Sequence, residues 1–140
     1  MTNWVYPPSG SAADGVWDIS LGTSDSAIAI DGWEHTGLKV ATIPAGAAVE
    51  LPAVGEERIV VPLSGAFTVT VDGVDHALEG RASVFHGPSD ILYSGTGKSV
   101  SISSADGGRV AIATAPCAHR LSDPPRHCCR DARGTPGGRR

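Results

Sequence analysis

The densest group of charged residues in the chain is Glu56, Glu57 and Arg58, and it is the first candidate for chemistry. A guanidinium holds a sugar-acid carboxylate through two parallel hydrogen bonds. If Arg58 and Glu57 lie at the mouth of a barrel, they form a predicted substrate-binding site. The same residues also fit an ion pair within the chain that secures the start of a strand. The sequence leaves both interpretations open.

A second group of candidates lies in the segment GRASVFHGPSD, residues 80–90. Arg81 is a further candidate for binding a sugar acid, or it can pair with Asp90 across the turn. His86 follows a predicted strand and precedes a Gly87-Pro88 turn. An imidazole at a barrel mouth can act as an acid or base near neutral pH, whereas the structural alternative is a polar residue that merely ends a strand.

Histidine and cysteine spacing argues against a metal site within this chain. Such a site on a barrel needs two histidines one residue apart on a strand, a carboxylate soon after them, and a third histidine on a facing hairpin. The five histidines are scattered, and the segment before Glu56 reads Val49-Glu50-Leu51. Cys128 and Cys129 lie next to His127 without a second ligand pair. We expect no metal ligands and no cofactor bound by this chain.

The elements that must position these residues are short strands. From Gly37 onward, apolar residues recur with period two in runs closed by Gly, Pro or Asp, which is typical of half-buried antiparallel strands. Asp72-Gly73 predicts a hairpin turn, because both residues tolerate a positive φ. Glu79-Gly80 and Ser64-Gly65 are further predicted turns. The predicted strands are Leu38–Ile43, Arg58–Leu63, Ala66–Asp72, Val74–Leu78, Val84–Phe85, Ile91–Tyr93, Val100–Ser103 and Arg109–Thr114.

Composition further limits the fold class, the partners and the location of the protein. The chain has 18 glycines and 10 prolines, and its 26 charged side chains are 11 Lys or Arg and 15 Asp or Glu, which disfavours a helical bundle. Residues 1–116 carry 13 acidic and five basic groups, so we expect no nucleic-acid partner. The chain contains no apolar run long enough to cross a bilayer and no signal-peptide pattern. We expect a cytoplasmic protein with no membrane partner, and the three cysteines fit a reducing compartment.

The alternation of apolar residues is less regular at the two ends of the chain. Trp4, Trp17 and Trp33 lie in the first 36 residues, where we expect them to cover one end of the sheets. After Pro116 the alternation stops, and residues 117–140 carry six arginines and almost nothing to bury. We therefore predict one barrel domain at 1–116 and a basic, disordered tail at 117–140. A reading-frame shift in the gene is one explanation of this tail.

Eight short pieces occur in the order found in the 5-deoxy-glucuronate isomerase family of inositol catabolism, which the chain resembles over about residues 3 to 116. They are Asn3-Trp4, Gly32-Trp33, Thr36-Gly37-Leu38, Glu57–Gly65, Val69–Gly73, Gly80–Phe85, Gly87–Tyr93 and Gly108–Pro116. Unbroken order makes a chance match improbable. The resemblance implies an all-β fold, a cupin-type antiparallel β-barrel or sandwich of jelly-roll-like form.

Members of that family resemble two cupin barrels in one chain, and this sequence matches only the first. The resemblance implies an aldose–ketose isomerisation between 5-deoxy-glucuronate and 5-dehydro-2-deoxy-gluconate. It also implies a divalent metal in the second barrel, held by histidines and a glutamate with no counterpart here. Partners would be a sugar-acid substrate and either a second cupin half or another copy of the chain.

Three functions remain open at this stage. The first is a truncated 5-deoxy-glucuronate isomerase whose N-terminal barrel is inactive alone. The second is a metal-free cupin module that binds a sugar acid or mediates assembly, with Arg58 and Arg81 as anion-binding candidates. The third is an inactive degenerate fragment, which would aggregate because an unpaired barrel exposes an apolar face.

Overall fold

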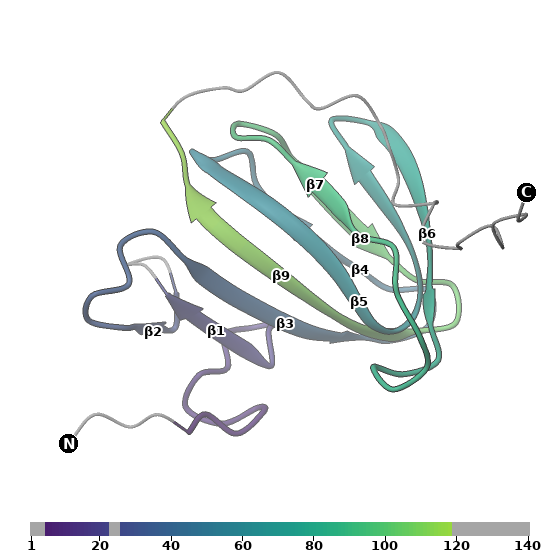
Figure 1. The fold of residues 1–140 in the computed structure, drawn as a ribbon, viewed down its shortest axis with the longest axis horizontal. Helices are drawn as coiled ribbons and strands as arrows, with labels where there is room; N and C mark the ends of the chain where they lie inside the picture. The colour runs from purple at the N-terminus through teal and green to yellow at the C-terminus, as the bar shows by residue number, and fades with distance from the viewer. Residues whose placement is uncertain (1–4, 23–25, 119–140) are drawn as a thin grey trace, which may run out of the picture.

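The computed structural model describes residues 5–22 and 26–118, and within them the chain forms nine β-strands and no helix (Figure 1). All pairings are antiparallel except that of the first two strands. The predicted all-β class is confirmed. The strands are β1 (Ile19–Gly22), β2 (Ile28–Ala29), β3 (Gly37–Ile43), β4 (Ala48–Leu51), β5 (Glu56–Val71), β6 (Val74–Arg81), β7 (Leu92–Ser94), β8 (Val100–Ser103) and β9 (Gly108–Pro116).

One long strand, β5, organises the sheet. Its first half pairs with β9 on one side and β7 on the other, and its second half pairs with β6 and β8. The register shifts between Pro62 and Ser64 and again between Gly65 and Phe67, and such bulges bend a strand. The sheet, ordered β2-β1-β3-β9-β5-β8-β4 with β6 and β7 also on β5, therefore curls into a half-barrel (Figure 1).

Two predicted turns are wrong, because β5 and β6 run through them without a break. The turn expected at Ser64-Gly65, between separate strands, is a bend inside β5, where Gly65 has a φ of 90°. Only Gly fits there easily, since a Cβ on Gly65 would lie 2.6 Å from the carbonyl oxygen of Gly107. The turn expected at Glu79-Gly80 is also wrong, because β6 continues to Arg81.

The hairpin at Asp72-Gly73 is confirmed. Asp72 has a φ of 47° and Gly73 a φ of 82°, and Val71 pairs with Val74 across the turn. The strand predicted at Val84–Phe85 is wrong, since residues 82–91 form turns between β6 and β7. Phe85 is 92% exposed there. The apolar residues of this segment therefore do not mark the buried face of a strand.

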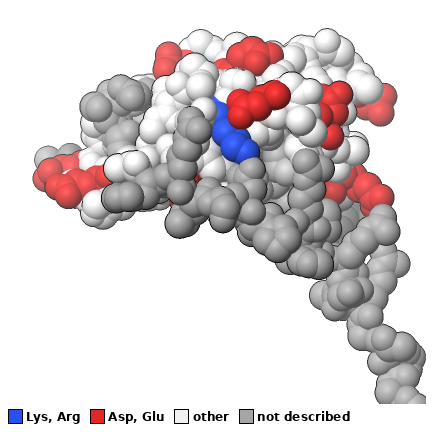
Figure 2. All heavy atoms as spheres, turned by 90° about the horizontal axis from the view of Figure 1, so that it is seen from above, with Lys and Arg blue, Asp and Glu red and all other residues white. Residues whose placement is uncertain are grey.

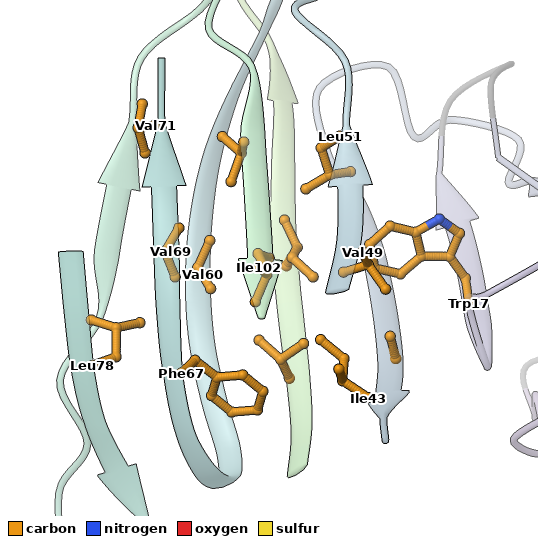
Figure 3. Packing of buried hydrophobic residues seen from close by; sticks show 14 residues of the cluster. Trp17, Ile43, Val49, Leu51, Val60, Phe67, Val69, Val71, Leu78 and Ile102 are labelled. Atoms are coloured by element: carbon orange, nitrogen blue, oxygen red, sulfur yellow. The ribbon is translucent and has the colours of Figure 1, made fainter. Parts of the chain in front are cut away.

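The core fills the space between the two halves of the curled sheet. Alternation in β5 turns Val60, Phe67 and Val69 toward side chains of β4, β8 and β9, and Figure 3 shows these residues pointing at one another. Fully burying an aliphatic side chain of this size contributes about 1.5–3 kcal/mol. The buried members are Trp17, Ala41, Ile43, Val49, Leu51, Val60, Phe67, Val69, Val71, Leu78, Val100, Ile102, Val110 and Ile112.

A second, smaller cluster lies against β1 and β2. Ala12, Leu21 and Ile30 are its buried members, and Trp33 packs on it while remaining partly exposed. Trp17 instead belongs to the main core, with the Lys39 ammonium 5.5 Å from its ring centroid. The tryptophans thus divide between two clusters. Trp4 lies outside the described residues, and so does residue 119 onward of the predicted disordered tail, 117–140.

Candidate functional site

The start of β5 sends neighbouring side chains to opposite faces of the sheet. Arg58 is buried on the inner face, whereas Glu57 and Ile59 are partly or largely open to the outside. Because successive residues of a strand point in opposite directions, Glu57 and Arg58 cannot line one binding site. The ion pair that Arg58 makes is with Glu56, whose Oε2 lies 3.9 Å from its Nη2.

The Arg58 guanidinium is committed to backbone carbonyls. Nη1 donates to the carbonyl oxygen of Lys98 at 2.9 Å, and Nη2 donates to that of Pro52 at 2.6 Å. Its side chain is 2% exposed. Burial lowers the pKa of this guanidinium, and the nearby Glu56 carboxylate opposes that shift. Arg58 therefore ties the β4–β5 and β7–β8 loops to the sheet.

A row of buried polar residues crosses the inner face at the level of Arg58. Thr114 on β9 and Ser94 on β7 are its register partners, and Gly37 on β3 is the partner of Thr114. The Arg58 Nε and the Ser94 Oγ are both buried without a hydrogen-bond partner. This polar row separates the apolar core from the loops at this end of the half-barrel.

Loop contacts close the end of the half-barrel that holds Arg58. The Gly97 amide donates to the carbonyl oxygen of Val54 at 2.8 Å, and the Cys117 amide donates to that of Gly55 at 2.9 Å. The Thr96 hydroxyl donates to the carbonyl oxygen of Cys117 at 3.0 Å. These bonds join three loops over the polar row and shield Arg58 from solvent.

Glu57 lies on the outer face of the sheet, opposite to the inner face that holds Arg58. The Tyr93 hydroxyl donates to Glu57 Oε1 at 2.9 Å, and Tyr93 is the register partner of Ile59 on the same outer side of the sheet. Figure 2 shows Asp and Glu atoms at several places on one face of the molecule and Lys and Arg atoms at one place among the described residues. This distribution agrees with the acidic balance of residues 1–116.

Arg81 is the last residue of β6, paired with Gly65 at the bend of β5, and His86 lies in the β6–β7 loop that follows it. Arg81 Nε donates to the carbonyl oxygen of Pro62 at 3.2 Å, and its Nη1 donates to that of Gly87 at 3.3 Å. His86 is exposed, with Nδ1 2.7 Å from the Ser83 hydroxyl. Arg81 is half-buried, so it retains access to solvent.

The expected contact between Arg81 and Asp90 does not form. Asp90 instead accepts the backbone amides of Glu79 at 2.7 Å and Gly80 at 2.9 Å. These carboxylate–amide bonds hold the base of the loop, and charge-assisted bonds of this kind are the stronger ones. The four predicted binding residues thus occupy three places. Arg58 lies on the inner face and Glu57 on the outer face, whereas Arg81 lies at the end of β6 and His86 in the loop that follows it.

The described residues do not fit a divalent-metal site. They contain no group of three or more His, Cys, Asp and Glu side chains able to hold an ion. Val49 and Leu51 on β4 occupy the segment where a barrel metal site would carry its His-x-His pair, and both point into the apolar core (Figure 3). The described residues also contain no helix with the length and apolarity to cross a membrane.

Ser94 and Thr114 were missed by sequence reasoning. Each lies in a strand of alternating residues, where a small hydroxyl side chain gives no local sign of facing inward or outward. Only the pairing of β7 and β9 with β5 places both beside Arg58. No signal in the sequence alone distinguishes them from surface Ser and Thr residues.

The comparison with protein families identifies the chain's family. A model described as the KduI/IolB family matches residues 5–135, which extends beyond the barrel boundary predicted at residue 116. No curated protein is significantly similar to the chain.

Among solved structures, the chain is similar to an IolB-like protein from Salmonella typhimurium, with 25% identity and a TM-score of 0.60. That alignment covers 64% of this chain and 35% of the other chain, so this chain spans well under half of its relative. An RmlC-like cupin from Shewanella frigidimarina has 17% identity and a TM-score of 0.49, covering 61% of this chain and 70% of that one. The cupin domain of Schizosaccharomyces pombe Cnp3 has 19% identity and a TM-score of 0.49, covering 62% and 60%. The predicted fold, a cupin-type antiparallel barrel, is confirmed.

Proposed function

Because the chain belongs to the KduI/IolB family, we propose that it is the metal-free N-terminal barrel of a 5-deoxy-glucuronate isomerase. Family membership and the IolB-like relative support the coarser statement, a cupin of a sugar-isomerase family. The proposal adds the substrate 5-deoxy-glucuronate, the product 5-dehydro-2-deoxy-gluconate, a role in inositol catabolism and a cytoplasmic location. It also places the catalytic residues in protein beyond these 140 residues.

The observation that carries this proposal is the apolar interior. Val49 and Leu51 face the core with 6% and 5% exposure, and the inward side chains packed around them, away from the row of Arg58, Ser94 and Thr114, are aliphatic or aromatic. Such an interior is packed for stability and offers no cluster of ligands for a polar substrate. We therefore assign this barrel a scaffolding role within the isomerase.

Two of the predicted residues remain available for contacting a sugar acid. Arg81, at the end of β6, is half-buried, and His86, in the loop that follows, is exposed; Asp90 holds the base of that loop. A guanidinium at a loop edge pairs well with a carboxylate. Arg58 contributes differently, because its donors already hold the carbonyl oxygens of Pro52 and Lys98.

The test is an isomerase assay on the purified 140-residue chain, combined with elemental analysis. We expect no turnover of 5-deoxy-glucuronate, with or without added zinc or manganese, and no metal retained in a one-to-one ratio. The proposal is wrong if the chain alone isomerises the sugar acid, or if it holds one divalent ion per chain through dialysis.

A metal-free binding module is the second candidate, favoured by the accessible Arg81 beside an ordered loop. Titration calorimetry with a uronic acid would then show saturable heat that is lost in Arg81→Ala. Lys98→Ala, which removes a cation from the β7–β8 loop, is the matched control and should bind as well as the unchanged chain. Absence of heat at millimolar ligand would exclude this function while leaving the scaffolding role intact.

A further inference from the structure

The end of the half-barrel that holds Arg58 contains buried polar atoms that the described part of the chain does not satisfy. Arg58 and Ser94 are each 2% exposed, and the Arg58 Nε and the Ser94 Oγ are buried without a hydrogen-bond partner. Such atoms are rare in folded proteins, because a buried donor or acceptor without a partner costs the full free energy of its desolvation. Two of them on neighbouring strands indicate a bound group that satisfies both.

The two unsatisfied atoms lie on the same face of the sheet. Arg58 on β5 and Ser94 on β7 are register partners, and the Cβ atoms of such a pair are about 5 Å apart. The Arg58 Nε and the Ser94 Oγ nevertheless make no hydrogen bond to each other. One water molecule joins two polar atoms that cannot reach each other directly, through two hydrogen bonds of about 2.8 Å.

Glu56 supplies a third group beside the same guanidinium. Glu56 and Arg58 are two positions apart on β5, so their side chains leave the same face of the strand. The Glu56 Oε2 lies 3.9 Å from the Arg58 Nη2, an ion pair that is longer than a hydrogen bond. Within residues 5–22 and 26–118, the Glu56 carboxylate accepts no hydrogen bond. A polar contact of this length is commonly bridged by a water molecule.

The chemistry of these three groups requires a neutral molecule. The Arg58 Nε–H can only donate a hydrogen bond and the ionised Glu56 carboxylate can only accept one, so the bound group must both accept and donate. A metal cation cannot accept, and an anion such as chloride cannot donate. An anion would also lie beside the negative charge of Glu56. The Ser94 hydroxyl places no further restriction, because it can donate or accept.

The surroundings limit the bound molecule to the size of water. The next residues along the inner face are Val60 on β5, which is 0% exposed, and Leu92 on β7, which packs against the core. On the other side, the Arg58 Nη atoms lie 2.6 Å from the carbonyl oxygen of Pro52 and 2.9 Å from that of Lys98. Apolar side chains and loop backbone therefore enclose the three polar groups.

We propose that Arg58, Ser94 and Glu56 bind one internal water molecule. The water accepts a hydrogen bond from the Arg58 Nε–H, donates one to the Glu56 carboxylate and shares a third with the Ser94 hydroxyl, and about three bonds are typical of a buried water. It joins β5 to β7 and bridges the Arg58–Glu56 ion pair. This inference goes beyond the proposed function, since it holds whether or not the chain takes part in an isomerisation.

The test is magnetic relaxation dispersion of oxygen-17 water on the full chain, which counts the water molecules that stay bound for long times. Ser94→Val removes the hydroxyl and fills its surroundings with methyl groups, so we expect it to lower the count by about one per chain. Ser104→Val is the matched control, since Ser104 is also buried, at 3% exposure, but its hydroxyl donates to the carbonyl oxygen of Ala66 at 2.7 Å. This control should leave the count unchanged. Equal counts in the unchanged chain and in Ser94→Val would overturn the proposal.

Measurements on the unchanged chain keep the outcome decisive if either variant fails to fold. A rotating-frame Overhauser spectrum filtered through the Arg58 Nε nitrogen should show a cross-peak to water, with the sign that reports proximity rather than proton exchange. A folded chain without that cross-peak overturns the proposal. A crystal grown in bromide provides the second measurement, and we expect no anomalous scattering between Arg58 and Ser94. A bromide peak there would identify an anion in place of water and would also overturn the proposal.

Discussion

At the scale of single residues, Arg58 shows how burial decides between two uses of one side chain. Its alternatives were a carboxylate-binding group at a barrel mouth and an internal tie. The guanidinium is buried and donates to carbonyl oxygens of residues 52 and 98, which belong to two different loops. A buried charge is expensive unless it is hydrogen-bonded, so these bonds hold both loops firmly against the sheet.

We expect Arg58→Ala to lower the free energy of unfolding by about 2–4 kcal/mol, because it removes two charge-assisted hydrogen bonds made by a buried guanidinium. Arg58→Lys should lose less, since a single ammonium can still make one of them. Arg81→Ala is the matched control: Arg81 also donates to two carbonyls but is half-buried, and its loss should cost about 1 kcal/mol. Urea unfolding measures all three. Equal losses for Arg58→Ala and Arg81→Ala would contradict the assigned role of Arg58.

At the scale of elements, the bend of β5 is what makes a half-barrel from one sheet. Residues before the bulges pair with β9 and β7, and residues after them pair with β6 and β8. Gly65 and Gly80 lie close together at this bend, where β5 and β6 approach more tightly than side chains allow. The glycines are therefore part of the strand pairing rather than of separate turns.

Gly80→Ala tests this element. Gly80 has a φ of 62°, and a Cβ at this position would overlap the backbone carbonyl of Gly65. We expect a loss of about 3 kcal/mol or more in the free energy of unfolding, measured by thermal or urea unfolding. Gly73→Ala provides the comparison, since its φ is 82° but its surroundings are open, and about 1 kcal/mol is expected. If the two variants were equally stable, the close approach of β5 and β6 would not be a constraint.

At the scale of the whole molecule, stability depends on the inner face of the curled sheet. The inner face holds fully buried side chains contributed by β4, β5, β8 and β9. The outer face carries smaller and partly exposed apolar residues bounded by Arg109 and Glu57. The outer face of the same sheet therefore contributes less to the free energy of folding.

Ile102→Ala distinguishes the inner core from the exposed apolar residues. Ile102 lies on β8 and is 0% exposed, so truncation should leave a cavity and cost about 2–5 kcal/mol. Ile91→Ala, at a position that is 51% exposed, should change the free energy of unfolding by only about 0.5 kcal/mol. Chemical denaturation of both variants provides the measurement. A small effect of Ile102→Ala would show that the inner face is loosely packed.

Much of this organisation follows from the order of residues alone. Period-two alternation predicts β3, β8 and β9 closely, because apolar side chains on one face of a strand recur at every second position. Asp72-Gly73 predicts its hairpin, since the positive φ values of that turn are a local property of these residues. The eight ordered pieces predict the family. All of these signals lie within a few neighbouring positions.

Only the tertiary structure decided those features that depend on contacts between residues far apart in the sequence. Whether Ser64-Gly65 turns or bends, and whether Val84 and Phe85 face a core, depends on strands elsewhere in the chain. The burial of Arg58 depends on a carbonyl oxygen 40 residues away. The separation of Glu57 from Arg58 follows from the strand geometry, but which of them faces inward is settled only when the sheet curls. Burial and electrostatic pairing are properties of the assembled sheet, so local sequence patterns alone could not determine them.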